Sequence, residues 1–179
     1  DYDMLKMGAL EVIFEVAKFY LDYGVYVPLR DRFEVWDVLG PDEYHERVHN
    51  NAFTNQLVKF VFDVLLKYEA YFKENHDQYF NQLVSRLAYE EVLAWLHSYQ
   101  SKVFVRKADE QGIIEQFDGY FKLHDIKLQD LLNERIHPNE YLGGHGLAGD
   151  TKIIKQADVI TMLYLFNDLY QLETMEKSE

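Results

Sequence analysis

The strongest constraint on the fold is a helical spacing of apolar residues in four long stretches of the chain. In these stretches apolar side chains follow one another at intervals of three and four residues: 4–23, 52–71, 79–98 and 151–172. This spacing places them on one face of an α-helix, and such wide apolar faces are typical of helices packed in layers. We therefore predict an all-α fold.

Two stretches, 25–51 and 98–150, lack this pattern, apart from a short helical patch near residues 125–133. Four of the nine glycines lie between Gly143 and Gly149. Loops longer than about 12–15 residues in a compact domain usually carry function or are disordered. We expect the chemistry at these loops and at the helix starts that follow them. No inter-domain linker is visible, so one domain is predicted.

The charge balance excludes several classes of function. The chain has 18 basic and 31 acidic residues, a net charge of −13. Such an acidic surface repels phosphate backbones and anionic lipid, so we expect neither a nucleic-acid partner nor a membrane partner. Cysteine is absent, which excludes disulfides and thiolate chemistry and suits a reducing, cytoplasmic location.

The densest polar stretch is LGPDEYHERVHNNAFTN, residues 39–55. It can be a solvated loop that ends in a helix cap, because Asn and Thr are ordinary cap residues. It also contains an H-E-x-x-H pattern, which on a helix would offer His45 and His49 to zinc with Glu46 as general base. The flanking residues are polar, whereas a catalytic zinc helix is normally buried.

A second polar cluster lies inside KIIKQADVITMLYLF, residues 152–166. One interpretation is a Lys155–Asp158 pair at the rim of a core helix. The other is that Lys155 and Gln156 donate hydrogen bonds to a polyhydroxylated ligand. The segment 113–123 mixes acids with aromatic residues, as a packing loop or a sugar-contacting loop would. No phosphate-binding loop is present, because the glycines of LGGHGLAGD lack the following Lys and Ser or Thr.

These residues resemble the motifs of glycoside hydrolase family 65, the family of the maltose, kojibiose, nigerose and trehalose phosphorylases. The resemblance covers nearly the whole chain in the right order. It rests on GPDEYH (40–45), NNAFTN (50–55), GIIEQFDGYF (112–121), KQADV (155–159) and LYLF (163–166).

The resemblance implies that the chain is roughly the second half of an (α/α)6 barrel. Residues 1–179 would then form a single partial catalytic domain. The neighbouring parts of the barrel, the family's Trp-Asp motif, most of the phosphate site and the terminal β domains are expected outside it.

It also implies an activity, the inverting phosphorolysis of an α-glucosidic disaccharide to β-glucose 1-phosphate. The match places the general acid at Glu43, whose carboxyl must be protonated before reaction and whose pKa we therefore expect to be raised. No metal and no cofactor is expected, and inorganic phosphate is the co-substrate. Lys155 and Gln156 are expected to bind the glucosyl unit, and the candidate supporting residues are Asp42, His45, Asn51 and Asn55.

Three alternatives remain from the sequence: a hydrolase of the trehalase type, the zinc peptidase of His45, Glu46 and His49, and a helical scaffold without catalysis. The hydrolase needs a second carboxylate that acts on water. We expect the isolated chain to be folded but inactive. Its apolar faces predict a homo-oligomer or self-association, because large exposed apolar patches usually drive association.

Overall fold

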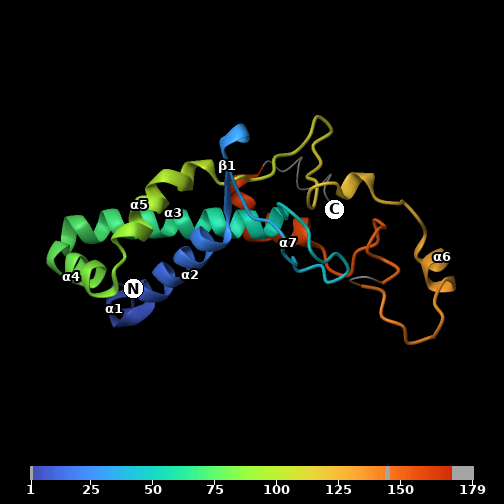
Figure 1. Ribbon diagram of the computed structural model, residues 1–179, viewed down its shortest axis with the longest axis horizontal. Helices are drawn as coiled ribbons and strands as arrows, with labels where there is room; N and C mark the ends of the chain where they lie inside the picture. The colour runs from blue at the N-terminus through green and yellow to red at the C-terminus, as the bar shows by residue number, and fades with distance from the viewer. Residues whose placement is uncertain (1, 144–145, 171–179) are drawn as a thin grey trace. The chain divides into compact units, whose positions relative to one another are not determined.

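The computed structural model describes residues 2–143 and 146–170, and its regular structure is mostly helical (Figure 1). The chain divides into two compact units. Unit 1 comprises Asp1–Glu34 and Leu57–Phe104, and unit 2 comprises Val35–Gln56 and Val105–Glu179.

Unit 1 contains most of the long helices. In chain order its elements are α1 (Tyr2–Met4), the π-helix η1 (Leu5–Ala9), α2 (Leu10–Tyr23), β1 (Val25–Val27), the 3-10 helix η2 (Pro28–Arg30), β2 (Arg32–Glu34), α3 (Ala52–Asn75, which begins in unit 2), α4 (Asp77–Leu87), α5 (Glu90–Tyr99) and the 3-10 helix η3 (Gln100–Lys102). The helix predicted over 52–71 is confirmed and extends to Asn75. The one predicted over 4–23 is interrupted by the π-turn, where Gly8 has φ 125°.

Aromatic side chains are among the largest in the core of unit 1. The ring of Phe14 on α2 stacks on Tyr89 with centroids 4.4 Å apart and planes 7° from parallel. Both rings are almost completely buried. The hydroxyl of Tyr89 donates to Glu15 at 2.6 Å, so burying its polar end leaves no lost hydrogen bond.

A short β-hairpin was not predicted from the sequence. Strands β1 and β2 pair antiparallel with Tyr26 opposite Phe33. The connection runs through η2 and Asp31, which takes a left-handed conformation at φ 46°. Each strand has only three residues, which is too short for an alternating pattern to stand out.

The single helix predicted over 79–98 is wrong. It is two helices, because Ala88 adopts the left-handed conformation at φ 54° and ψ 48° and ends α4. The next helix, α5, starts at Glu90 and packs against α2. A left-handed residue commonly ends a helix, but it is usually Gly or Asn. Because the residue at this position is alanine, the break between the two helices was not predicted from the sequence.

Unit 2 consists mainly of long loops with short helices. Its elements besides the start of α3 are η4 (Tyr120–Lys122, 3-10), α6 (Leu128–Asn133), α7 (Asp158–Leu165) and η5 (Asn167–Leu169, 3-10). The patch predicted near 125–133 corresponds to α6. The helix predicted over 151–172 is wrong, since α7 begins only at Asp158 and ends at Leu165. Residues 171–172 of that prediction lie outside the described residues.

Replacing Ala88 by glycine tests the helix break. A Cβ is disfavoured at φ 54°, so Ala88→Gly should raise the free energy of unfolding by about 1 kcal/mol. Urea unfolding followed by circular dichroism measures it. Ala94→Gly, at an exposed position inside α5, is the matched control and should lower the same quantity by about 1 kcal/mol. Equal losses in both variants would contradict the assignment.

Candidate functional site

The polar residues predicted as a site converge in unit 2 around the buried carboxylate of Asp42. One of its oxygens, Oδ1, accepts the backbone N–H of Lys155 at 2.9 Å and that of Tyr44 at 3.2 Å. The other, Oδ2, lies 2.6 Å from His45 Nδ1 and accepts Gln116 Nε2 at 2.9 Å. Burial favours the neutral acid, but the hydrogen bonds outweigh it and lower the pKa of Asp42 below its usual value.

A second buried carboxylate, Asp158, stands at the first position of α7. Its Oδ1 accepts the N–H of Asp42 at 2.7 Å, and its Oδ2 accepts Asn51 Nδ2 at 2.7 Å. Burial raises the pKa of Asp158 to about 6 despite these bonds. Asn51 also accepts the N–H of Thr54 at 3.0 Å and so caps the start of α3. Asp158 is thus fully buried and bonded to Asp42 and Asn51, whereas the sequence had suggested a pair with Lys155 at the rim of a core helix.

Three hydrogen bonds donated by backbone N–H groups join the loop around Glu43 to residues 155–158, at the start of α7. In two of them, the N–H of Lys155 donates to Asp42 and the N–H of Asp42 donates to Asp158. In the third, the N–H of Glu43 donates to Gln156 Oε1 at 3.1 Å. A glycine is required where these segments meet. A Cβ on Gly40 would lie 2.3 Å from Asp158 Oδ2 and 2.5 Å from Asn51 Nδ2. Lys155 and Gln156 therefore lie in a loop fixed by tertiary contacts, not on a helix.

These links bring the side chains of Glu43 and Lys155 together as an ion pair. Both side chains are about half exposed, 47% for Glu43 and 42% for Lys155. The hydrogen bond from Lys155 lowers the pKa of the Glu43 carboxyl, and the same bond raises the pKa of Lys155. The expectation of a raised pKa at Glu43 is therefore wrong for the ligand-free protein.

His45 is buried between two hydrogen-bond acceptors. Its Nε2 lies 2.8 Å from the carbonyl oxygen of Thr151, and its Nδ1 faces the Asp42 carboxylate. A carbonyl and a carboxylate only accept, so both ring nitrogens must donate and the ring is an imidazolium. Burial opposes the charge, but the bonds to Asp42 and Thr151 raise the pKa of His45.

The zinc-peptidase interpretation does not survive these contacts. Residues 45–49 are not helical, so His45 and His49 are not displayed one turn apart on a helix face. Both nitrogens of His45 are engaged, and His49 Nδ1 accepts the N–H of Asp37 at 3.0 Å. Over residues 2–143 and 146–170, no three His, Asp or Glu side chains are arranged to hold a metal ion.

Arg106, which was not predicted from the sequence, braces the loop that precedes α3. This buried side chain donates to the carbonyl of Asn50 at 2.8 Å and to Glu115 at 2.8 Å, and it pairs with Asp118. Asn55 donates to Asn50 Oδ1 at 3.2 Å. Asn55 thus supports Asn50. Gln116, the donor to Asp42, was also missed, although it lies in the motif GIIEQFDGYF.

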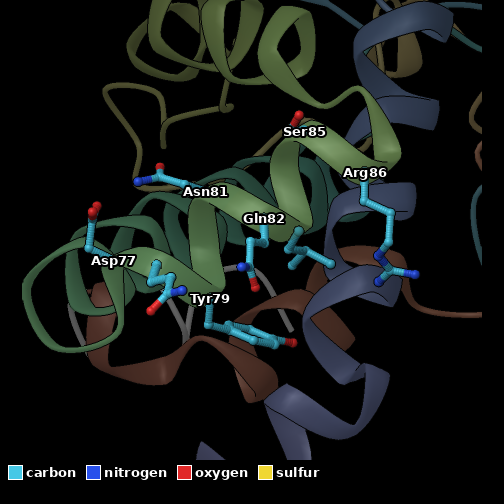
Figure 2. Close-up of a pocket in the computed structure, with 8 residues that line it drawn as sticks. Asp77, Tyr79, Asn81, Gln82, Ser85 and Arg86 are labelled. Atoms are coloured by element: carbon cyan, nitrogen blue, oxygen red, sulfur yellow. The ribbon is translucent and has the colours of Figure 1, made fainter.

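Two pockets on the surface differ in whether residues of the candidate site line them. A groove of about 890 Å³ follows α4 and is lined by residues of that helix, as Figure 2 shows. Its lining contains none of the predicted site residues. A smaller pocket of about 200 Å³ lies in unit 2, where Gln116, Ile154 and Ala157 are among its lining residues. Within the described residues, no helix combines the length and apolar character needed to cross a membrane.

Comparison with known proteins decides the family. The sequence profile of the glycosyl hydrolase family 65 central catalytic domain matches residues 1–178. The chain belongs to glycoside hydrolase family 65. The resemblance inferred from the motifs is therefore confirmed.

Named relatives in the family are phosphorylases. The chain is 38% identical to nigerose phosphorylase of Lachnoclostridium phytofermentans, over 99% of this chain and 24% of the relative. It is 39% identical to 1,2-alpha-glucosylglycerol phosphorylase of Bacillus selenitireducens, over 98% of this chain and 23% of the relative. The chain thus spans about a quarter of the length of the curated relatives it matches.

The fold also matches a solved structure. A candidate kojibiose phosphorylase from human microbiome superposes with a TM-score of 0.84 over 99% of this chain and 24% of that chain, at 23% identity. The predicted class, an all-α part of the family's helical barrel, is confirmed. The roles of Glu43, Lys155 and Gln156 stay predictions.

The protonation of His45 gives a pH-dependent prediction. Because its pKa is raised on folding, the imidazolium stabilises the fold fully below its ordinary value of 6.5. That stabilisation is lost as the pH rises through the raised value. Nitrogen-15 NMR of the chain should show that the His45 ring loses its proton at a higher pH than a free imidazole, whose pKa is 6.5, with His45→Gln to assign the signals. A His45 ring that is mostly neutral at pH 6.5 would contradict the contacts described.

Proposed function

We propose that these 179 residues supply the general acid and the glucosyl-binding residues of a longer phosphorylase. Its reaction is the inverting cleavage of an α-glucosidic disaccharide by inorganic phosphate, which releases β-glucose 1-phosphate. The observation that carries the proposal is the hydrogen-bonded link between the two loops, which sets Glu43 against Lys155 and Gln156. The relatives named as phosphorylases of nigerose, kojibiose and glucosylglycerol support it.

A phosphorylase of this kind needs only one carboxyl group for proton transfer. An inverting hydrolase uses an acid for the leaving oxygen and a base for water, about 6.5–9.5 Å apart. Phosphate is already an anion at neutral pH, so no base has to activate it. In our proposal Glu43 donates its proton to the glycosidic oxygen while phosphate attacks the anomeric carbon from the opposite face.

The ion pair with Lys155 explains how Glu43 can become protonated when substrate binds. In the ligand-free protein the ammonium group favours the carboxylate. In our proposal a sugar hydroxyl takes the place of Glu43 as the partner of Lys155. The negative charge of Asp42, which already acts to raise the pKa of Glu43, is then no longer opposed by an ion pair between Lys155 and the Glu43 carboxyl. The dianion of phosphate adds to the same effect.

The hydrolase alternative is less well supported by this part of the chain. Its second carboxylate would have to activate a water molecule. Asp42 and Asp158, the buried acids next to Glu43, each accept hydrogen bonds through both oxygens. They are therefore better suited to hold the backbone than to take a proton from water. A cytoplasmic location and self-association of the isolated chain stay predictions.

Replacing the acid tests the proposal in the full-length protein that contains these residues. Glu43→Gln should lower the rate of phosphorolysis by about 10²–10⁴, because the leaving oxygen then departs without a positioned proton donor. Release of glucose 1-phosphate from a panel of α-linked disaccharides measures it.

Glu46→Gln is the matched control, because Glu46 lies in the same loop and its side chain is exposed. It should retain nearly full activity. If Glu46→Gln were the crippling change and Glu43→Gln were active, the assignment of the acid would be wrong. Release of glucose without any need for phosphate would favour the hydrolase.

A further inference from the structure

Tyr141 presents an exposed aromatic ring beside the Glu43 loop. Its hydroxyl donates to the backbone carbonyl of Glu43 at 2.9 Å, while 54% of the residue is exposed. A tyrosine whose polar end is fixed and whose ring faces solvent offers a rigid apolar surface to a ligand.

The segment that carries Tyr141 is anchored locally. Leu142 is buried in a cluster with Leu131 and Ala148, and the N–H of Ala148 donates to the carbonyl of Leu142 at 2.7 Å. A Cβ on Gly143 would lie 2.4 Å from the Tyr141 hydroxyl and 2.7 Å from the Glu43 carbonyl. The chain therefore approaches the Glu43 loop as closely as only glycine allows, and this close packing holds the Tyr141 ring in place.

The Tyr141 ring borders the ion pair of Glu43 and Lys155. The Nζ atom of Lys155 lies 5.9 Å from the ring centroid. The ring of Tyr44 packs edge-on against it, with centroids 6.2 Å apart and planes at 73°. Any group bound within reach of both charged side chains is therefore close to this ring.

We propose that Tyr141 forms part of the binding site for the leaving group, the sugar or polyol that departs with the proton of the acid. The inference rests on the proposed role of Glu43. A general acid lies within hydrogen-bond reach of the oxygen it protonates, so the leaving group must lie next to Glu43. The Tyr141 ring packs against the carbon face of that group, and its hydroxyl oxygen, already a donor to Glu43, accepts a hydrogen bond from it.

This role separates the recognition of the two halves of the substrate. Lys155 and Gln156 are assigned to the glucosyl unit, which becomes glucose 1-phosphate. Tyr141 contacts only the half that leaves. Changing its ring should therefore alter the choice of leaving group and should not alter binding of the glucosyl phosphate.

The reverse reaction of the full-length protein tests this directly, because the leaving group is then a separate acceptor substrate. With β-glucose 1-phosphate as donor, Tyr141→Ala should raise KM for a sugar acceptor such as glucose by about tenfold or more and leave KM for the donor within about twofold. Tyr141→Phe keeps the ring but loses the bond to Glu43, so its acceptor KM should rise by less than that of Tyr141→Ala. The matched control is Tyr164→Ala, since Tyr164 is 76% exposed and should change neither constant.

Equal rises of the acceptor and donor KM in Tyr141→Ala would overturn the inference. The inference would also be overturned if Tyr141→Phe were as impaired as Tyr141→Ala, with a lower kcat and an unchanged KM for the acceptor. Tyr141 would then only hold the loop of the acid in position. Calorimetric binding of glucose to Glu43→Gln protein, with Tyr141 intact or replaced by Ala, gives a readout without turnover. Weaker binding after replacement supports the inference even if no phosphorolysis is found, and unchanged binding contradicts it.

Discussion

Two buried carboxylates hold together the part of the chain that carries the candidate site. Asp42 accepts a backbone N–H from the segment before α7, and Asp158 accepts the backbone N–H of Asp42. Unit 2 has few regular elements to satisfy its backbone groups, and a buried N–H without a partner costs about 1–3 kcal/mol. The carboxylates meet that need, and in doing so they fix Glu43 relative to Lys155 and Gln156.

The same arrangement sets the charges at the site. His45 is held as an imidazolium against Asp42, so the carboxylate of Asp42 stays ionised in a buried place. Asp42 then adds negative charge next to Glu43, where Lys155 opposes it in the ligand-free protein. In our account Glu43 is an ionised carboxylate while Lys155 is paired with it. It becomes a protonated acid when the bound substrate takes its place as the partner of Lys155. Substrate binding and proton supply are thereby coupled through one lysine.

The comparison of sequence and structure shows which features local patterns can predict. The helix at 52–71 was predicted because its apolar spacing continues without interruption in α3. The break at Ala88 was not, since a left-handed alanine leaves no mark on the apolar pattern. The predicted helix at 151–172 starts late because the N–H of Lys155 is bonded to Asp42, a residue 113 positions away.

The residues of the candidate site were predicted only in part, because contacts between residues far apart in the sequence leave no local pattern. The motifs named Glu43, Lys155 and Gln156, and the structure brings them together. The lowered pKa of Glu43 was not predictable, because it depends on the ion pair with Lys155, which only the folded chain creates. Tyr141 and Arg106 were missed because their contacts with Glu43 and Asn50 span 98 and 56 positions and leave no local pattern.

The pH dependence of phosphorolysis by the full-length protein tests the central claim most directly. At saturating phosphate, kcat/KM for the disaccharide reports the pKa of Glu43 in the enzyme without disaccharide, and kcat reports it in the complex. The acid must be protonated, so each profile falls as the pH rises through that pKa. Our account predicts that kcat falls at a higher pH than kcat/KM does, because Lys155 leaves Glu43 when the sugar binds. The same pKa in both profiles, or a lower one in kcat, would contradict it.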